Sequence, residues 1–277
     1  MLQETEISLI LNSDPASGST RQSADGSQFE VDLLSSMRLP KEGLNCTISL
    51  EQASVWWVMP NIVSGVNDKM YITGPNVAGT TTAFTITIPQ GLYDLASLDN
   101  TIQALLQNAD AKISPFPIVS LSGDDATQKA VFLMNYTDVE IDFTQTDTPQ
   151  GILGYDSRVV GPFAGAPQHE FADNIASFNQ ISNFLIHTDL ADEGLMLNNS
   201  YSQVIGQVLI DVNPGSQVNY QPTHAPKCSA SRLLGSSRDS IRVWITDQSN
   251  NAINMNSENC SILLSLRYQT PYFVERR

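Results

Sequence analysis

Residues 44–61 read LNCTISLEQASVWWVMPN, a long run of residues that favour β-structure. From Cys46 to Leu50 apolar residues alternate with polar ones, which is the period of a strand with one buried face. Residues 55–59 continue the run without a polar break. Pro60 should end it, because proline has no N–H to donate to a neighbouring strand. The run therefore predicts a long strand in a β-rich core.

Further strand signals lie on both sides of this run. Upstream, FEVDLL at residues 29–34 alternates apolar and acidic side chains. Downstream, the candidates are SFNQISNFLIHTDL (177–190), SYSQVIGQVLIDV (200–212), the proline-broken NYQPTHAPKCSAS (219–231), RDSIRVWITDQ (238–248) and CSILLSLRYQ (260–269). Several short strands separated by turn signals are typical of a β-sandwich or jelly roll. The sequence therefore predicts a mainly β chain.

Residues 68–160 differ in kind from the segments on either side. They predict a strand at 83–88, a helix over 98–109 with Ser97 as its N-cap, and then three more strands. We expect a small α+β domain inserted into a single jelly-roll β-sandwich. The jelly roll would comprise residues 26–67 and 161–277, and residues 1–25 would form a flexible N-terminal arm with one possible strand in ISLILN. Two successive domains are the alternative, but the segment before Pro60 has too few strands to bury a core.

Composition excludes several functions. The 277 residues carry a formal net charge of −15, and only 16% of them are charged, against about 25% in typical proteins. Net negative charge repels phosphate backbones, so we expect no direct nucleic-acid binding. No apolar run is long enough for a membrane span, and the N-terminus lacks the basic start of a secretory signal. Three widely spaced cysteines exclude a disulfide framework and fit a reducing site of synthesis.

Catalytic signals are few. His187 and Asp189 lie on one face of an expected strand, about 7 Å apart at strand spacing. They could form an acid–base pair, or His187 could be a structural or interface histidine. The sequence has no G-x-S-x-G motif. Cys228 follows Lys227, which could lower the pKa of its thiol. We expect no enzyme, no catalytic residues, no cofactor and no metal.

Acidic residues are concentrated in the expected insertion. Residues 68–170 hold 12 acids and 4 bases. Calcium binding is one interpretation of this cluster, because hard cations prefer oxygen ligands. A solvated acidic face is the other, and we favour it for DVEIDF at residues 138–143. The cluster comprises Asp124, Asp125, Asp138, Glu140, Asp142 and Asp147.

Aromatic residues suggest where partners could bind. Strand alternation turns one of Trp56 and Trp57 inward and the other outward, and an outward tryptophan on a strand is typical of an interface. Trp56, Trp57, His187 and Asp189 are therefore the interface candidates. Trp244 should also point outward and would be the platform of a carbohydrate-binding module. The C-terminal YFVERR is a candidate docking segment.

Seven phrases of the sequence resemble a known family. They are WWVMPNI (56–62), TITIPQGLYDLASLDNTIQALL (85–106), DATQKAVFLM (125–134), ILGY (152–155), FNQISNFLIHTDL (178–190), IGQVLIDVNPGSQVNYQP (205–222) and SRDSIRVWITDQ (237–248). Together they resemble the penton, or minor capsid, proteins of virophages and polinton-like viruses, which belong to the lineage of adenovirus and tectivirus-like phages. No residue-level site motif of that family can be matched to individual positions.

The resemblance implies a structural virion protein. Family pentons are single jelly rolls, some with an inserted domain, that form homopentamers at the five-fold vertices of an icosahedral capsid. The implied partners are further copies of this chain, the major capsid protein, and a vertex spike or host receptor. The implied location is the capsid vertex of a virion made in a host cell. The alternatives are a major capsid protein, a receptor-binding spike, or a carbohydrate-binding β-sandwich module.

Overall fold

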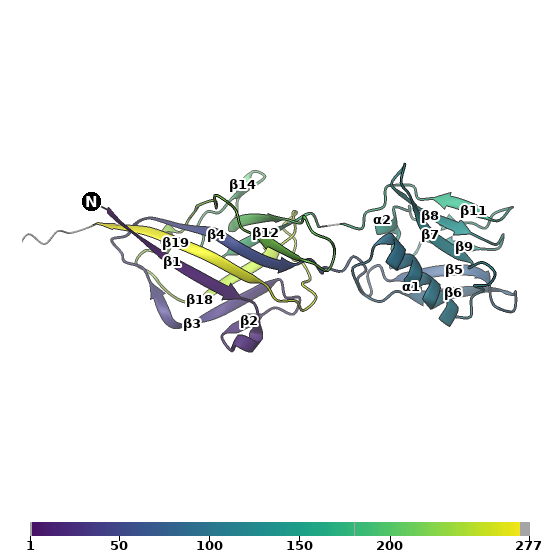
Figure 1. Cartoon of the computed structure of the whole chain (residues 1–277), viewed down its shortest axis with the longest axis horizontal. Helices are drawn as coiled ribbons and strands as arrows, with labels where there is room; N and C mark the ends of the chain where they lie inside the picture. Colours follow the sequence, from purple (N-terminus) through teal and green to yellow (C-terminus); the bar gives the residue numbers. More distant parts are fainter. Residues whose placement is uncertain (1, 180, 272–277) are drawn as a thin grey trace, which may run out of the picture. The chain divides into compact units, whose positions relative to one another are not determined.

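The computed structural model describes residues 2–179 and 181–271, and it divides the chain into two compact units. One unit joins Met1–Met59 to Ile181–Arg277, and the other is Pro60–Gln180. The second unit is therefore an insertion in the first. Figure 1 shows the elements of both.

The first unit is a sandwich of two antiparallel sheets. One sheet has the order β1-β19-β4-β16, with β17 also paired to β4, and the other has the order β15-β12-β18-β3-β2. Their bounds are β1 Leu2–Asn12, β2 Thr20–Gln22, β3 Gln28–Arg38, β4 Leu44–Trp56, β12 Asn183–Thr188, β15 Val204–Leu209, β16 Gln217–Tyr220, β17 Cys228–Ser229, β18 Ser237–Thr246 and β19 Ser261–Pro271. Two short 3-10 helices, Pro15–Ser17 and Ser231–Leu233, and the hairpin β13 (Met196–Leu197) and β14 (Ser200–Tyr201) complete the unit.

The strand connections are those of a jelly roll. Eight strands, β1, β3, β4, β12, β15, β16, β18 and β19, form two four-stranded layers, and every connection except the β12–β15 hairpin crosses between the layers. The first and last strands, β1 and β19, lie side by side in one layer (Figure 1). The prediction of a single jelly roll is confirmed.

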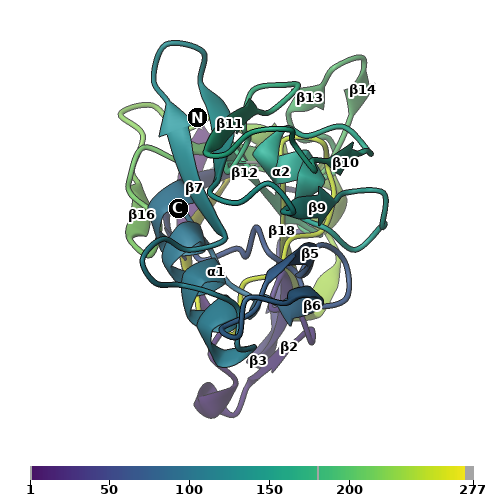
Figure 2. The same ribbon diagram turned by 90° about the vertical axis from the view of Figure 1, so that its right-hand side faces the viewer.

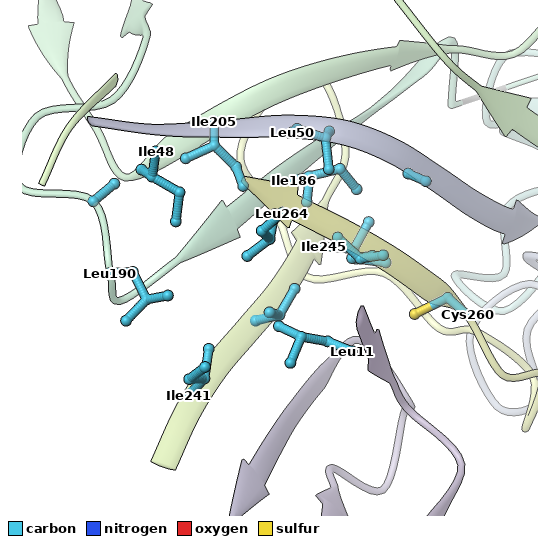
Figure 3. Packing of buried hydrophobic residues seen from close by; sticks show 14 of the residues in the cluster. Leu11, Ile48, Leu50, Ile186, Leu190, Ile205, Ile241, Ile245, Cys260 and Leu264 are labelled. Atoms are coloured by element: carbon cyan, nitrogen blue, oxygen red, sulfur yellow. The ribbon is translucent and has the colours of Figure 1, made fainter. Parts of the chain in front are cut away.

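Apolar side chains fill the space between the two sheets. Ile48 and Leu50 of β4 face Ile186 of β12, and Leu264 of β19 lies among them (Figure 3). All four are fully buried. The alternation at the start of β4 thus produces one face of this core. Gly206 of β15 faces the same core, because a Cβ there would lie 2.4 Å from a methyl group of Leu50.

The insertion has its own hydrophobic core. Its sheets have the orders β10-β9-β5-β6 and β11-β8-β7, and α1 packs against β6 and β7 (Figure 2). Their bounds are β5 Lys69–Pro75, β6 Thr81–Thr87, α1 Leu95–Asn108, β7 Val119–Asp124, β8 Lys129–Met134, β9 Glu140–Asp142, α2 Gln150–Leu153, β10 Val159–Val160 and β11 Gln168–Phe171. The apolar face of α1, Leu98, Ile102 and Leu106, is completely buried in this core.

Three expectations were wrong. Residues 1–25 are not a flexible arm, because β1 pairs with β19 over its whole length, from Leu2↔Pro271 to Asn12↔Ser261. The insertion boundaries are not 68 and 160. Ile62 is fully buried in the core of the insertion, and β11 adds a strand to its sheet, so the unit runs over Pro60–Gln180.

The third error concerns the start of α1. The N-cap is Asp94, and Ser97 is the third helical residue. The Asp94 carboxylate accepts a hydrogen bond from the Ser97 backbone N–H at 2.7 Å, and the Ser97 hydroxyl accepts one from the Asp94 backbone N–H at 3.0 Å. Such a reciprocal capping box satisfies two free N–H groups and starts the helix one turn earlier.

Candidate assembly surface

A groove crosses the outer face of the β1-β19-β4-β16 sheet. It has a volume of about 370 Å³. The residues that line it come from all four strands and the residue after β16: Ile10, Gln52, Ala53, Ser54, Asn219, Tyr220, Gln221, Ser261 and Leu263. None of them is charged, and Ile10 is 78% exposed at one end of the groove. Such a neutral, partly apolar depression suits contact with another protein surface.

The two adjacent tryptophans point to opposite faces of their sheet, as strand alternation predicts. Trp57 is buried in the sandwich core and its backbone bonds to the turn before β16, through Ser216 and Gly215. Trp56 lies between two inward residues, Val55 and Trp57, so its side chain turns to the outer face, where it is partly exposed. Trp56 is on the same sheet face as the groove.

His187 is buried, with 3% of its surface exposed. Its Nε2 lies 2.8 Å from the Thr246 hydroxyl, and its ring stacks on Trp244 with centroids 5.0 Å apart. Burial lowers the pKa of His187 to about 4, because the charged form loses its hydration. The side chain is therefore neutral at pH 7 and joins β12 to β18.

Asp189 has partners of its own. Its carboxylate accepts a hydrogen bond from the Arg242 backbone N–H at 3.0 Å, and its own N–H donates to the Arg242 carbonyl at 3.2 Å. Burial raises the pKa of Asp189, and the bond from Arg242 partly offsets this. Both contacts extend the pairing of β12 with β18. The two side chains thus serve the sheet separately, and this geometry does not favour an acid–base pair with His187.

Other sequence candidates also have structural partners. Trp244, the suggested carbohydrate platform, has one ring face covered by His187. Cys46, Cys228 and Cys260 are all buried and unpaired. Burial raises the pKa of the Cys228 thiol, which is opposite to the effect expected from Lys227, and it raises the pKa of both Cys46 and Cys260 to about 11.

The acidic residues of the insertion do not converge on one point. Asp124 caps a turn through Thr127, Asp142 accepts from Thr144, and Asp147 pairs with Lys69 at 2.7 Å. Within residues 2–179 and 181–271, no group of three or more His, Cys, Asp or Glu could hold a metal ion. No helix in that same part of the chain is long and apolar enough to cross a membrane. YFVERR lies outside the described residues.

Sequence reasoning missed two features that bear on assembly. The first is the groove, whose residues lie far apart in the sequence. The second is the set of edge strands of the sandwich, which are β1 and β16 in one sheet and β15 and β2 in the other. The 11 residues of β1 contain no proline and no bulge against β19, and the charged side chains on this edge are Glu4 and Glu6 at its N-terminal end. The remainder of the edge, from Ile7 to Asn12, carries none of these protective features.

The fold is similar to that in the crystal structure of the selenomethionine-labelled penton protein of mavirus, with a TM-score of 0.48 and 11% sequence identity, covering 96% of this chain and 99% of that chain. No protein-family model matches the sequence. No curated protein matches it either.

Proposed function

We propose that the chain is a structural virion protein, a penton that forms homopentamers at the five-fold vertices of an icosahedral capsid. The resemblance of its sequence to virophage penton proteins points to this function. The eight-stranded jelly roll with an insertion between β4 and β12 agrees with the fold that the resemblance implies.

The observation that carries the proposal is the uncharged groove on a chain of net charge −15. Copies of such a chain repel one another, and this repulsion is weakest where their surfaces lack charge. A charged group buried without a partner in the contact would cost several kcal/mol. The groove, whose uncharged lining comes from four strands, meets this requirement, whereas the Arg267 ion pairs with Glu6 and Glu51 lie elsewhere on the same sheet. The major capsid protein would contact other faces of the pentamer.

The test is the mass of the purified protein in solution, measured by light scattering on a sizing column. One chain is 30.3 kDa, and we expect the mass of five chains. A trimer would overturn the penton assignment in favour of a major capsid protein or spike. If only a monomer is found, the protein should be located in purified particles by electron microscopy. Density at positions other than the five-fold vertices would then refute the proposal.

A further inference from the structure

We infer that two different surfaces of the jelly roll meet between neighbouring copies. The first is the hairpin patch, which consists of Met196, Leu197 and Tyr201 on the β13–β14 hairpin together with Leu209 of β15. The second is the groove on the outer face of the β1-β19-β4-β16 sheet. The hairpin patch of one copy would bind in the groove of the next. This inference rests on the proposed function, because it assigns the contact that closes the ring.

The hairpin patch is an exposed apolar surface. Met196 is 55% exposed, Tyr201 64% and Leu209 65%. Beside them is a small cavity of about 130 Å³, lined by Asn183, Leu185, Leu195, Met196, Leu197, Val204, Gln207 and Gln248. Exposed apolar side chains beside a cavity with a mixed apolar and amide lining are typical of a site that a partner covers.

One polar atom in this cavity lacks a partner. Asn183 is 8% exposed, and its amide nitrogen donates to the Ser182 hydroxyl at 3.1 Å. Its carbonyl oxygen Oδ1 is buried and has no hydrogen-bond partner. Leaving a buried acceptor unpaired costs about 1–3 kcal/mol. Because Oδ1 is buried, a partner's N–H could remove that penalty only if the cavity opens on binding, for instance by movement of Met196 or Leu197.

The groove offers matching chemistry. Gln52, Asn219 and Gln221 carry side-chain amides that can donate N–H groups, and the Tyr220 hydroxyl can donate as well. Ile10 and Leu263 provide the apolar surface against which Leu209 and the hairpin would pack. The groove thus provides an apolar surface against which the hairpin patch can pack. It also provides hydrogen-bond donors, which the apolar side chains of the patch do not have.

Charge identifies the occupant as a second copy. Residues 194–210, which include the hairpin patch, contain no Lys, Arg, Asp or Glu. The groove residues are also uncharged. Each copy has a net charge of −15, so the electrostatic repulsion between two copies is weakest where these two uncharged surfaces face each other.

The two surfaces adjoin along one edge of the sandwich. The hairpin patch borders β15 and the groove reaches β16, the edge strands of opposite sheets, and Leu209 shares a pocket with Asn219, Tyr220 and Gln221. Leu209, which pairs with Asn183, and Ser54 of the groove both lie near the end of the sandwich where the chain leaves at 60 and returns at 181. Two different patches that bind each other generate a ring when the rotation closes, whereas a self-complementary patch gives a dimer.

The test uses single charges at exposed positions. Leu209→Asp alters the hairpin patch and Ile10→Asp alters the groove. We expect each variant to lose the five-chain species and to run as a single chain by light scattering. Leu34→Asp is the control, because Leu34 is an exposed leucine of the jelly roll that belongs to neither surface. It should keep five chains. Tryptophan fluorescence checks that all three variants are folded.

Cross-linking locates the contact directly. Met196→Cys or Tyr201→Cys, each combined with Ile10→Cys or Leu263→Cys in one chain, should give a ladder of up to five linked chains after mild oxidation. The single cysteine variants should give no ladder, since all native cysteines are buried. If the wild type is pentameric but both Asp variants stay pentameric, or no pair cross-links, this inference is overturned while the proposed function stands. A wild type that is not pentameric overturns the proposed function itself.

Discussion

Acid should destabilise the jelly roll through His187. In the folded protein the pKa of this histidine is lowered to about 4 by burial against Trp244 and Thr246. In the unfolded chain it returns to about 6.5. A group whose pKa is lower in the folded state binds a proton more readily when the chain unfolds. The contribution of His187 to the free energy of unfolding is therefore fully present above pH 6.5, and it is lost as the pH falls from 6.5 toward 4.

The two pKa values set the size of the effect. The full difference corresponds to about 3 kcal/mol of unfolding free energy, and about 2 kcal/mol of it should be gone by pH 5. Little screening by solvent is expected, because His187 is 3% exposed. Against a typical domain stability of 5–15 kcal/mol, such a loss is easily measured.

Denaturant titrations from pH 8 to pH 5, followed by tryptophan fluorescence, measure this loss. All three tryptophans, Trp56, Trp57 and Trp244, belong to the jelly roll, so the signal reports on that unit alone. The comparison is between the wild type and His187→Gln at one protein concentration. Glutamine does not titrate in this range, so the variant should lack about 2 kcal/mol of the decrease. His224→Gln, at an exposed histidine of the same unit, is the control.

The sign of the pH dependence separates the two interpretations of His187. If His187 were paired with the Asp189 carboxylate, its pKa would be raised, and its contribution would grow as the pH falls through the folded value. A wild type that gains stability relative to His187→Gln between pH 8 and pH 5 would therefore refute the buried, neutral histidine. Equal slopes for the two proteins would refute it as well.

Three further predictions follow from the packing. Ile48→Ala should cost about 2–5 kcal/mol, because the side chain is fully buried between the sheets, and denaturation followed by tryptophan fluorescence measures this. Asp94→Ala removes the N-cap of α1 and should cost the insertion about 1 kcal/mol, seen as faster amide exchange in α1, whereas unchanged exchange would contradict the capping box. The three cysteines should react with a thiol reagent only as fast as the protein unfolds, since all are buried, and rapid reaction of the native protein would contradict their placement.

The core strands could be predicted from the sequence because their apolar residues alternate with the same period as their buried side chains. The alternation of Ile241, Val243 and Ile245 is visible in the sequence and all three are buried in the structure. The N-terminal strand was missed over residues 2–6 because LQETE carries polar side chains on an edge strand. Its pairing with residues 267–271 lies more than 250 positions away in the chain.

The helix start shows a different limit. The sequence DLAS contains two good capping residues three positions apart, and local preference alone does not choose between Asp94 and Ser97. The structure uses both, with Asp94 as the N-cap and Ser97 as its capping-box partner at the third helical position. The groove had no local signal at all, since Ile10, Gln52 and Asn219 meet only after the sheet has formed.

The uneven distribution of charge over the chain leads to a last prediction, which concerns the effect of salt on assembly. The two surfaces that we propose to meet are uncharged, whereas residues 68–170 carry 12 acids and 4 bases. Salt therefore screens only the repulsion between copies, since there are no ion pairs across the contact to weaken. The Debye length falls from about 10 Å at 0.1 M to about 3 Å at 1 M. Raising NaCl over this range should increase the pentamer fraction at fixed protein concentration, as measured by light scattering. A pentamer that dissociates in salt would show that ion pairs hold the ring, and that the neutral groove is not its contact.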